Sequence, residues 1–345
     1  MSRRASLLPL GLLAILSACG GGGSTGPAPV VPTFPVKAAV FYDENGNGVL
    51  DAGEGSRLPD VTLEIGGRSG KTTRPLGEAT IDGVAQGPQS LTVRRGSLPA
   101  YFVPPASIAV TVPQSAGQFA LVPVTLPIGT NRASLYMGFG DSITIGQGSS
   151  DGQGYRGRLA DKLTAFFGVR ASVVDEGADA TKSNRGDERI DESLARRHPA
   201  YTLILYGTND WNAAECKNAP PCYTIDSLRD IVLSARGSQS LPVLSTIIPA
   251  DPTSIQQPDR NAWVAAQDDR IRALARSMSV PLADPQALFV KDPNFTHLYV
   301  DHVHPNDAGY ELIATAFFNA ITGPVDTSSS SLALPALFKS PRRKH

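Results

Sequence analysis

Ser142 lies in the segment Gly-Phe-Gly-Asp-Ser-Ile-Thr, at the end of a predicted strand and before a glycine-rich turn. A serine in this position can expose its hydroxyl where backbone N–H groups converge, which is the environment that a serine nucleophile needs. Gly146 and Gly148 follow and permit a tight turn. Taken alone, Gly-Asp-Ser is also an ordinary turn sequence, so the prediction of a nucleophile depends on finding a base and its partner elsewhere.

The segment Asp301-His302-Val303-His304-Pro305 supplies a candidate base and its partner. A serine hydroxyl needs a base within hydrogen-bond reach, and a carboxylate on the far nitrogen of that base fixes its tautomer. Asp301 and His304, three residues apart in one turn, can fill both roles. The alternatives are a metal site with His302 and a helix-capping turn. A metal is disfavoured because no third ligand stands at a recognisable spacing, so His302 is interpreted as a bystander.

Two further segments follow predicted strands between the serine and the histidine. Gly177 lies in Glu-Gly-Ala, and Asn209 lies in Gly-Thr-Asn-Asp. A glycine lets its backbone N–H approach a developing oxyanion closely, and an asparagine side chain offers an uncharged N–H donor. Each segment alone is typical of a turn. Their order along the chain matches what an oxyanion hole and a Ser, His and Asp triad require.

From about residue 133 the chain alternates between strand and helix patterns. This alternation, with its runs of Val, Ile and Leu, predicts an α/β domain whose parallel sheet is covered by helices on both faces. The carboxyl ends of parallel strands meet at one edge of the sheet, where the sites of such folds lie. The predicted strands are 134–138, 171–175, 201–206, 242–248 and 280–283, and the predicted helices are 155–167, 187–197, 225–235, 261–278 and 306–321.

Residues 134–322 resemble the SGNH or GDSL family of esterases and lipases. Four residues fall in order on the four sequence blocks of that family: Ser142, Gly177, Asn209 and His304. The resemblance implies a flavodoxin-like three-layer hydrolase domain over 130–323. The departure from the family pattern is Ile143, an apolar residue where the family name has Leu.

The resemblance also implies roles for individual residues. Ser142, Asp301 and His304 would be catalytic, and the Ser142 N–H, the Gly177 N–H and the Asn209 side chain would form the oxyanion hole. The implied function is hydrolysis of carboxylic esters with a short acyl, acetylated carbohydrate or lipid part, without a cofactor for catalysis. Two alternatives stay open: an acyltransferase that uses the same site, and a non-catalytic surface adhesin or carbohydrate-binding lipoprotein.

Residues 36–127 have a different sequence pattern, in which short runs of residues that favour β-strands are separated by turns rich in Gly and Pro. The clearest runs are 61–65, 90–93 and 107–112. This segment contains no apolar period of helical length. The pattern predicts a small N-terminal β-sandwich domain.

Residues 43–54 satisfy the calcium-loop pattern D-x-[DN]-x-[DN]-G-x₅-E without a mismatch. The expected oxygen ligands are Asp43, Asn45, Asn47, the Val49 carbonyl, Asp51 and Glu54, with Gly48 at the sharp turn. The alternative is an Asn/Gly-rich hairpin that binds no metal, because predicted strands rather than helices flank the loop. The segment resembles the calcium-binding β-sandwich repeats of bacterial surface proteins, of Cna B and SdrD B types, which implies a structural Ca²⁺.

The start of the chain is predicted to be an export signal. Arg3 and Arg4 precede an apolar run at 7–16 that is too short to span a bilayer. The sequence Leu-Ser-Ala-Cys that ends it resembles a bacterial lipobox, which implies removal of residues 1–18 and acylation of Cys19. The protein would then be anchored to a membrane of the bacterial cell envelope, at the outer membrane, in the periplasm or at the surface. An ordinary secretory signal with an incidental cysteine is the alternative.

The composition fits this organisation. The 345 residues, 41% hydrophobic and 18% charged, have room for two globular domains. Residues 19–35 are Gly- and Pro-rich and are predicted to be a linker, and the Ser-rich and basic residues 324–345 are predicted to be a flexible tail. The formal net charge of -1 is too small to indicate a nucleic-acid partner.

Cys216 and Cys222 are the two remaining cysteines. An exported protein meets an oxidising compartment, so a disulfide across this short segment is predicted. A metal site is the alternative, but no second cysteine pair and no nearby histidine supplies the other ligands.

Overall fold

The computed structural model describes residues 30–218, 222–253 and 259–323. Several predictions fall outside these residues: the signal at 1–18, the acylation of Cys19, most of the linker at 19–35 and the tail at 324–345. Within the described ranges, every helix falls short of the length and apolar character that a bilayer crossing requires.

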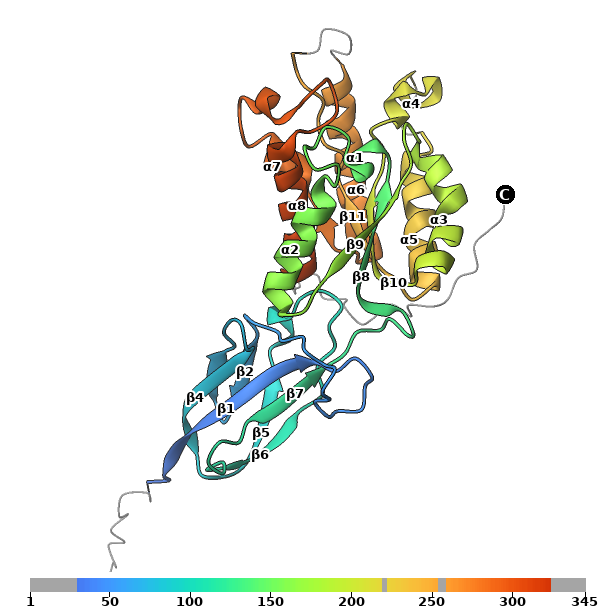
Figure 1. Ribbon diagram of the computed structural model, residues 1–345. Coiled ribbons are helices and arrows are strands. Elements are labelled where there is room, and N and C mark those ends of the chain that lie inside the picture. Colours follow the sequence, from blue (N-terminus) through green and yellow to red (C-terminus); the bar gives the residue numbers. More distant parts are fainter. Residues whose placement is uncertain (1–29, 219–221, 254–258, 324–345) are drawn as a thin grey trace, which may run out of the picture. The chain divides into compact units, whose positions relative to one another are not determined.

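The C-terminal part of the chain is built on a five-stranded parallel sheet (Figure 1). Its strands are β8 (Arg132–Gly140), β9 (Ser172–Gly177), β10 (Pro199–Leu205), β11 (Leu241–Ser245) and β12 (Leu282–Ala283). Their order across the sheet is β9-β8-β10-β11-β12. Counted along the chain, this is the 2-1-3-4-5 order of flavodoxin-like folds. The predicted α/β architecture with a parallel sheet is confirmed.

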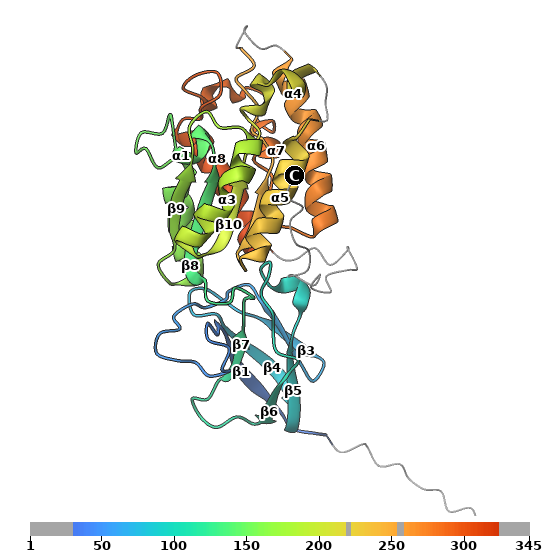
Figure 2. The ribbon, with the colours of Figure 1, turned by 90° about the vertical axis from the view of Figure 1, so that its right-hand side faces the viewer.

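Helices cover both faces of this sheet (Figures 1 and 2). One face carries α2 (Tyr155–Phe167) and α8 (Asp307–Thr322), and the other carries α3 (Ser183–Arg197), α5 (Thr224–Gly237) and α6 (Arg260–Met278). The shorter elements are α1 (Ser142–Ile145), α4 (Ala214–Asn218), α7 (Pro285–Phe289) and the 3₁₀ turns η1 (Arg95–Ser97), η2 (Asp210–Asn212) and η3 (Phe295–Leu298).

Side chains alternate between the two faces along each central strand. Tyr136 and Leu203 join the hydrophobic cluster that contains α2 and α8, whereas Met137 and Ile204 join the cluster under α3, α5 and α6. β10 and β11 are buried along their whole length. This is why apolar residues point to both faces of these strands, with Thr202 and Ser245 as the polar exceptions, rather than alternating with polar residues. The sheet is therefore a rigid layer whose carboxyl edge can hold a site.

The N-terminal part contains two sheets. The strands are β1 (Thr33–Tyr42), β2 (Thr62–Ile65), β3 (Arg68–Lys71), β4 (Glu78–Ala85), β5 (Gly87–Val93), β6 (Ile108–Val112) and β7 (Ala120–Val124). They pair in the orders β4-β1-β7 and β3-β2-β5-β6, and their buried side chains share one hydrophobic cluster. β1 begins at Thr33, inside the predicted linker, because Phe34 pairs with Val84 of β4. The register shifts between Phe34 and Val36, so the intervening Pro35 lies at an irregularity that tolerates its missing N–H.

The N-terminal part and the sheet domain contact each other directly. The Arg57 N–H donates to the Phe167 carbonyl (3.0 Å), and the Tyr101 hydroxyl donates to the Pro242 carbonyl (2.7 Å). The hydrophobic cluster of the N-terminal sheets continues into α2 and α8. The two predicted domains thus share a core.

Candidate active site

Ser142 is the first residue of α1, directly after β8. Asp141 is the N-cap of this short helix, and its Oδ1 accepts a hydrogen bond from the Ile143 N–H (3.0 Å). Gly146 ends the helix in the left-handed conformation, with φ 98°, which favours glycine. Gly140 is also required, because a Cβ at this position would collide with the Thr144 side chain and the Leu205 carbonyl. The sharp turn from strand to helix therefore fixes the serine at the carboxyl edge of the sheet.

His304 and Asp301 come from the loop between η3 and α8 and meet Ser142 there. Ser142 Oγ lies 3.0 Å from His304 Nε2, and His304 Nδ1 lies 2.7 Å from Asp301 Oδ2. Asp301 Oδ1 accepts from the backbone N–H groups of Val303 (2.8 Å) and His304 (2.7 Å). With the imidazole proton on Nδ1, His304 donates to Asp301 and its Nε2 can accept the Ser142 hydroxyl proton.

The Asp301 carboxylate is held in its charged form. Partial burial acts to raise its pKa, but the hydrogen bonds from His304 and Val303 outweigh burial and lower the pKa below the ordinary value. The carboxylate therefore stays ionised over the pH range in which a histidine can act as a base.

His302 is not part of the hydrogen bonds that join Ser142, His304 and Asp301. Its side chain is exposed, and its carbonyl accepts the Asp251 N–H (3.0 Å). Among the described residues, no three His, Cys, Asp or Glu side chains are arranged to hold a metal ion. Nothing in this part of the chain favours the metal alternative for the two histidines.

Asn209 lies in the turn that follows β10, the strand beside β8. Its Nδ2 donates to Asp141 Oδ2 (3.1 Å) and to the Thr181 carbonyl (3.2 Å). The amide that was predicted to face an oxyanion is thus held by two protein acceptors. An oxyanion would have to share or replace one of them.

Gly177 ends β9, on the other side of β8. A Cβ at Gly177 would come within 2.7 Å of the Ile145 nitrogen and 2.8 Å of the Asp141 carbonyl, so only glycine allows β9 to approach α1 this closely. Its N–H donates to Asp175 Oδ1 (2.8 Å). This predicted oxyanion donor therefore also has a protein acceptor, an interaction within β9 that the sequence pattern did not reveal.

Asp141 and Arg260 are buried ionisable groups at the site that sequence reasoning missed. Asp141 is 1% exposed, and burial, aided by the charge of Asp210, raises its pKa to about 7 against opposing hydrogen bonds and charges. Arg260 is 3% exposed and donates to the Thr208 carbonyl (2.7 Å). Burial lowers the pKa of Arg260 to about 10. The only sequence signal was the position of Asp141 beside Ser142.

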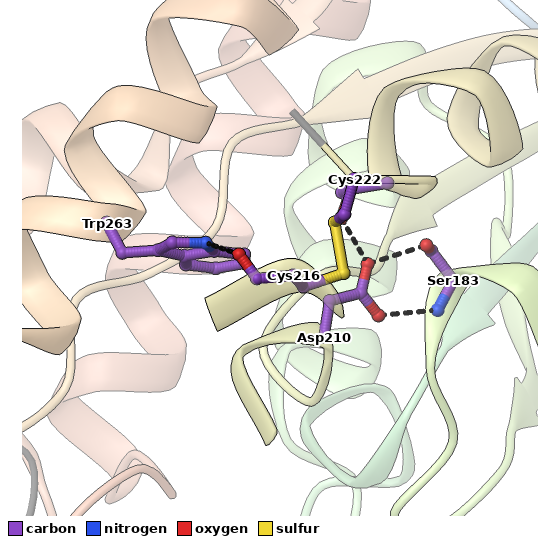
Figure 3. Close-up of a disulfide and its surroundings, with 6 residues drawn as sticks. Ser183, Asp210, Cys216, Cys222 and Trp263 are labelled. Carbon is purple, nitrogen blue, oxygen red and sulfur yellow. Dashed lines mark hydrogen bonds between the residues drawn. A yellow bond between two sulfur atoms is a disulfide. The ribbon is translucent and has the colours of Figure 1, made fainter. Parts of the chain in front are cut away.

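Asp210 anchors the turn that carries Asn209 (Figure 3). The carboxylate is fully buried and accepts from the Ser183 N–H (2.8 Å), the Ser183 hydroxyl (2.6 Å) and the Thr224 hydroxyl (2.6 Å). Ser183 begins α3 and Thr224 begins α5, so one carboxylate ties both helices to the end of β10. This contact also explains why α3 begins before residue 187, where the apolar period starts.

The predicted disulfide between Cys216 and Cys222 is confirmed (Figure 3). The Trp263 indole N–H donates to the Cys216 carbonyl (3.0 Å), and Cys222 Sγ lies 3.1 Å from the Thr224 hydroxyl. The bridge therefore sits beside the Asp210 anchor.

Residues 43–54 form a loop without a helix before or after it. Asp43 accepts three loop N–H groups, including that of Gly48 (2.8 Å), and Glu54 accepts those of Glu44 (2.9 Å) and Asp51 (3.0 Å). Asp43 and Glu54 are 2% and 5% exposed. In the described residues their carboxylates receive only N–H groups of the loop.

The other predicted calcium ligands line the same loop. The Asn45 and Asn47 amides both donate to Asp51 Oδ2, at 2.7 and 2.8 Å, and Val49 is exposed. All six candidate groups carry hard oxygen atoms, which suit Ca²⁺. As they stand, Asp43, Asp51 and Glu54 are not grouped as a metal site, so a bound ion would require the carboxylates to converge and the two amides to turn their oxygens toward it.

Comparison with known proteins identifies a family and a relative. Residues 139–312 match the GDSL-like Lipase/Acylhydrolase family. An acetylxylan esterase from Geobacillus stearothermophilus is 24% identical over an alignment of 215 positions that covers 57% of this chain and 96% of that protein.

Two of the solved structures that align with this chain are proteins from a metagenome and from a bacterium. One is LAE5, an α/β hydrolase enzyme from the metagenome of Lake Arreo, with 23% identity, coverage of 55% of this chain and 96% of that one, and a TM-score of 0.46. Another is a putative lipolytic protein of the G-D-S-L family from Desulfitobacterium hafniense, with 16% identity, coverage of 54% and 99%, and a TM-score of 0.45. On the strength of the family match, the chain belongs to the GDSL-like lipase/acylhydrolase family and is a carboxylic ester hydrolase.

Proposed function

We propose that the protein hydrolyses carboxylic esters through an acyl-enzyme on Ser142. The observation that carries this proposal is the series of hydrogen bonds from Ser142 Oγ to His304 Nε2 (3.0 Å) and from His304 Nδ1 to Asp301 Oδ2 (2.7 Å). A nucleophile, a base and a group that orients the base are thus already aligned without a cofactor.

In the first half-reaction, Ser142 Oγ attacks the ester carbonyl carbon while His304 Nε2 takes the hydroxyl proton. The tetrahedral intermediate collapses as the C–O bond to the alcohol breaks, and His304 returns the proton to the leaving oxygen. In the second half-reaction a water attacks the acyl-enzyme, its proton passes to His304, and the carboxylic acid leaves as the proton returns to Ser142. Asp301 stays ionised and stabilises the imidazolium in both halves.

The oxyanion would be stabilised by the Ser142 N–H, the Gly177 N–H and the Asn209 side chain. Ser142 is the first residue of a helix, where the N–H has no acceptor within the helix. Gly177 would exchange its present acceptor, Asp175, for the oxyanion, and Asn209 would exchange the Thr181 carbonyl while it keeps its bond to Asp141. Only a bond to the oxyanion that outweighs the acceptor given up would contribute to catalysis.

The test is Ser142→Ala against a short-chain aryl ester, with labelling by a fluorophosphonate. We expect Ser142→Ala to abolish both turnover and labelling. Ser150→Ala is the matched control, because Ser150 is exposed in the same segment and bonds to Asp307 rather than to the base. Activity in Ser142→Ala comparable to that of the wild type overturns the proposal. An unlabelled but folded wild type instead favours the binding alternative.

For the substrate we propose a short acyl ester, with acetylated carbohydrate as the first class to examine. The acetylxylan esterase relative supports this choice. The experiment compares aryl esters of increasing acyl length with acetylated xylan and with lipid esters. Addition of a sugar acceptor separates hydrolysis from acyl transfer, since a transferase yields the acylated acceptor in place of free acid.

We further propose that residues 36–127 form a β-sandwich of the Cna B or SdrD B type and that the loop at 43–54 holds a structural calcium ion. Two carboxylates, Asp43 and Glu54, are buried there without an ion pair to a Lys or Arg in the described residues. Burial and the neighbouring Glu54 raise the pKa of Glu44, as expected where negative charge accumulates. A divalent cation would relieve this repulsion.

The calcium proposal is tested by melting temperatures with added Ca²⁺ and with a chelator. We expect Ca²⁺ to raise the melting temperature of the wild type and of Asp82→Ala, an exposed acid of β4 outside the loop. Asp43→Ala should lose the response. The same melting temperature with and without calcium in the wild type counts against the site.

We also propose that the protein is exported and anchored in the bacterial cell envelope through acylated Cys19. The support is the signal-like segment 1–18 and the cysteine that follows it. Acyl chains on Cys19 would partition the protein into detergent, and Cys19→Ser should return it to the aqueous phase. Equal partitioning of both proteins contradicts the anchor.

A further inference from the structure

Arg189 of α3 reaches beneath the ends of the two strands that carry Ser142 and Gly177. Its Nη2 donates to the Gly140 carbonyl (2.9 Å) at the end of β8 and to the Glu176 carbonyl (2.5 Å) near the end of β9. One guanidinium thus joins the two strand ends, 49 and 13 residues away along the chain.

Aromatic side chains fix the direction of this guanidinium. Its Nε donates to the Tyr206 hydroxyl (3.1 Å), and Nη2 lies 2.6 Å from the same oxygen, so the two N–H groups of Nη2 are shared among Tyr206 and the two carbonyls. The guanidinium carbon lies 4.2 Å from the centroid of the Phe139 ring. When the face of a guanidinium stacks on an aromatic ring, its N–H groups, which lie in the guanidinium plane, stay free to form hydrogen bonds. The guanidinium plane is therefore determined by contacts on two sides, which makes its bonds to the carbonyls directional.

The Glu176 carbonyl has a direct link to the expected chemistry. It belongs to the same peptide group as the Gly177 N–H. A hydrogen bond from a cation to the oxygen of a peptide group polarises that group and makes its N–H a stronger donor. The Gly140 carbonyl also accepts the Ala178 N–H (2.9 Å), so Arg189 reinforces the contact that sets the spacing between β8 and β9.

We propose that Arg189 is a positioning residue of the oxyanion site: it locks the ends of β8 and β9 together and polarises the Glu176–Gly177 peptide toward the reacting oxygen. This inference rests on the proposed function. Arg189 touches no reacting atom, so its effect acts through the Gly177 N–H and through the turn that presents Ser142.

The test compares Arg189→Met and Arg189→Lys with the control Arg185→Met. Met keeps much of the apolar stem and removes the donors, and Lys keeps the charge but lacks the planar fork. Arg185 lies one turn earlier on the same helix, where it is exposed and pairs with Glu188. Far-UV circular dichroism and melting temperature establish that each variant is folded.

Removal of one direct oxyanion donor costs about 10²–10³ in kcat, so loss of a group that acts through such a donor should cost about 10-fold. We expect Arg189→Met to lower kcat by about that factor with KM unchanged. Its affinity for a boronic acid that mimics the tetrahedral intermediate should fall in proportion. Arg189→Lys should recover part of the loss, and Arg185→Met should equal the wild type.

If Arg189 only supports the fold, kcat and boronic acid affinity of the variants will differ from these expectations. If kcat and boronic acid affinity of a folded Arg189→Met equal those of the wild type, the inference is overturned. It is equally overturned if Arg185→Met causes the same loss. These outcomes leave the proposed function intact as long as Ser142→Ala is inactive, whereas activity in Ser142→Ala removes the proposed function itself.

Discussion

Asn209 and Asp141 are joined by a hydrogen bond of 3.1 Å from the amide Nδ2 to the carboxyl Oδ2, although they lie 68 residues apart. Asp141 is also the N-cap of the helix that begins with Ser142. One buried carboxyl therefore sets both the start of that helix and the orientation of the Asn209 amide. Its replacement should affect the oxyanion site before it affects the fold.

Asn209→Ala should lower kcat by about 10²–10³, because it removes a predicted oxyanion donor. Asp141→Asn should lower kcat less, since the donor remains and only its orientation is lost. If Asp141 acts through Asn209, the double variant will have the kcat of Asn209→Ala alone, a result that a double-mutant cycle measures. Additive losses would mean that the two residues act independently.

The pH dependence of kcat should contain an ionisation near 7 that belongs to Asp141, whose pKa burial raises to about 7. Above that pH the ionised carboxylate accepts more strongly from Asn209, so this component increases kcat as the pH rises. The comparison is a pH–rate profile of the wild type and of Asp141→Asn. Identical profiles after scaling would rule out a contribution from Asp141.

Asp301→Asn should lower kcat by up to about 10⁴, because an amide cannot hold the imidazole in the required tautomer or stabilise its charge. Because the pKa of Asp301 is lowered, this carboxylate stays ionised even at a pH equal to its ordinary pKa. It takes up a proton only when the pH falls through the lowered value. Loss of wild-type activity between pH 5 and 7 should therefore not arise from Asp301. Steady-state kinetics of the variant, with Asp82→Asn as an exposed control, test this expectation.

Asp268 should make stability fall as the pH rises. It is fully buried, its Oδ1 accepts the Ile247 N–H (2.7 Å), and its Oδ2 has no partner in the described residues. Burial raises its pKa to about 8, from an ordinary value of 3.8. Between these two values the unfolded chain releases the proton and the folded protein keeps it, so the free energy of unfolding decreases with pH.

Asp268→Asn removes this titration. The difference in melting temperature, variant minus wild type, should increase as the pH is raised from about 4 to 8. Any destabilisation that the amide itself causes is independent of pH and does not alter this trend. Asp269→Asn, which alters the exposed neighbouring acid, should run parallel to the wild type in this respect. Parallel curves for Asp268→Asn would contradict the buried protonated state.

Reduction of the disulfide between Cys216 and Cys222 should destabilise the protein without abolishing activity. Loop-entropy estimates for a ring this small give about 2 kcal/mol. The anchor of the adjacent turn is Asp210, which bonds to Ser183 and Thr224 independently of the bridge. The paired Cys→Ser variant should therefore melt earlier yet keep kcat within about two-fold on a small ester. A large fall in kcat would show that the bridge positions the site.

Periodicity in the sequence was sufficient to predict the main elements. Helix α2 has the predicted bounds, Tyr155–Phe167, because an amphipathic period and flanking glycines determine it locally. The three residues that hydrogen-bond in series, Ser142, His304 and Asp301, could be proposed for a related reason, since a Gly-Asp-Ser turn and an Asp and His pair are short local patterns. The long apolar runs of β10 and β11 indicated a sheet buried on both faces.

The contacts that hold the site together could not be predicted in this way. Asp141 to Asn209 and Arg189 to Gly140 connect residues far apart, and no local pattern specifies which polar groups will meet. Arg189 lies in a highly charged stretch that reads as a solvated helix face. The acceptor of the Gly177 N–H depends on the rotamer of Asp175, which composition does not determine.

Ser142 and His304, which lie 3.0 Å apart in space, are separated by 162 residues of chain. A loop that long must close before the nucleophile acquires its base, and four of the five strands of the parallel sheet, β9 to β12, lie in that loop. Ester hydrolysis therefore reports the completion of folding. A chain in which β8 and α1 have formed, but in which the loop between η3 and α8 has not docked, has no activity. During refolding, turnover should appear with the slowest phase rather than with the first gain of secondary structure.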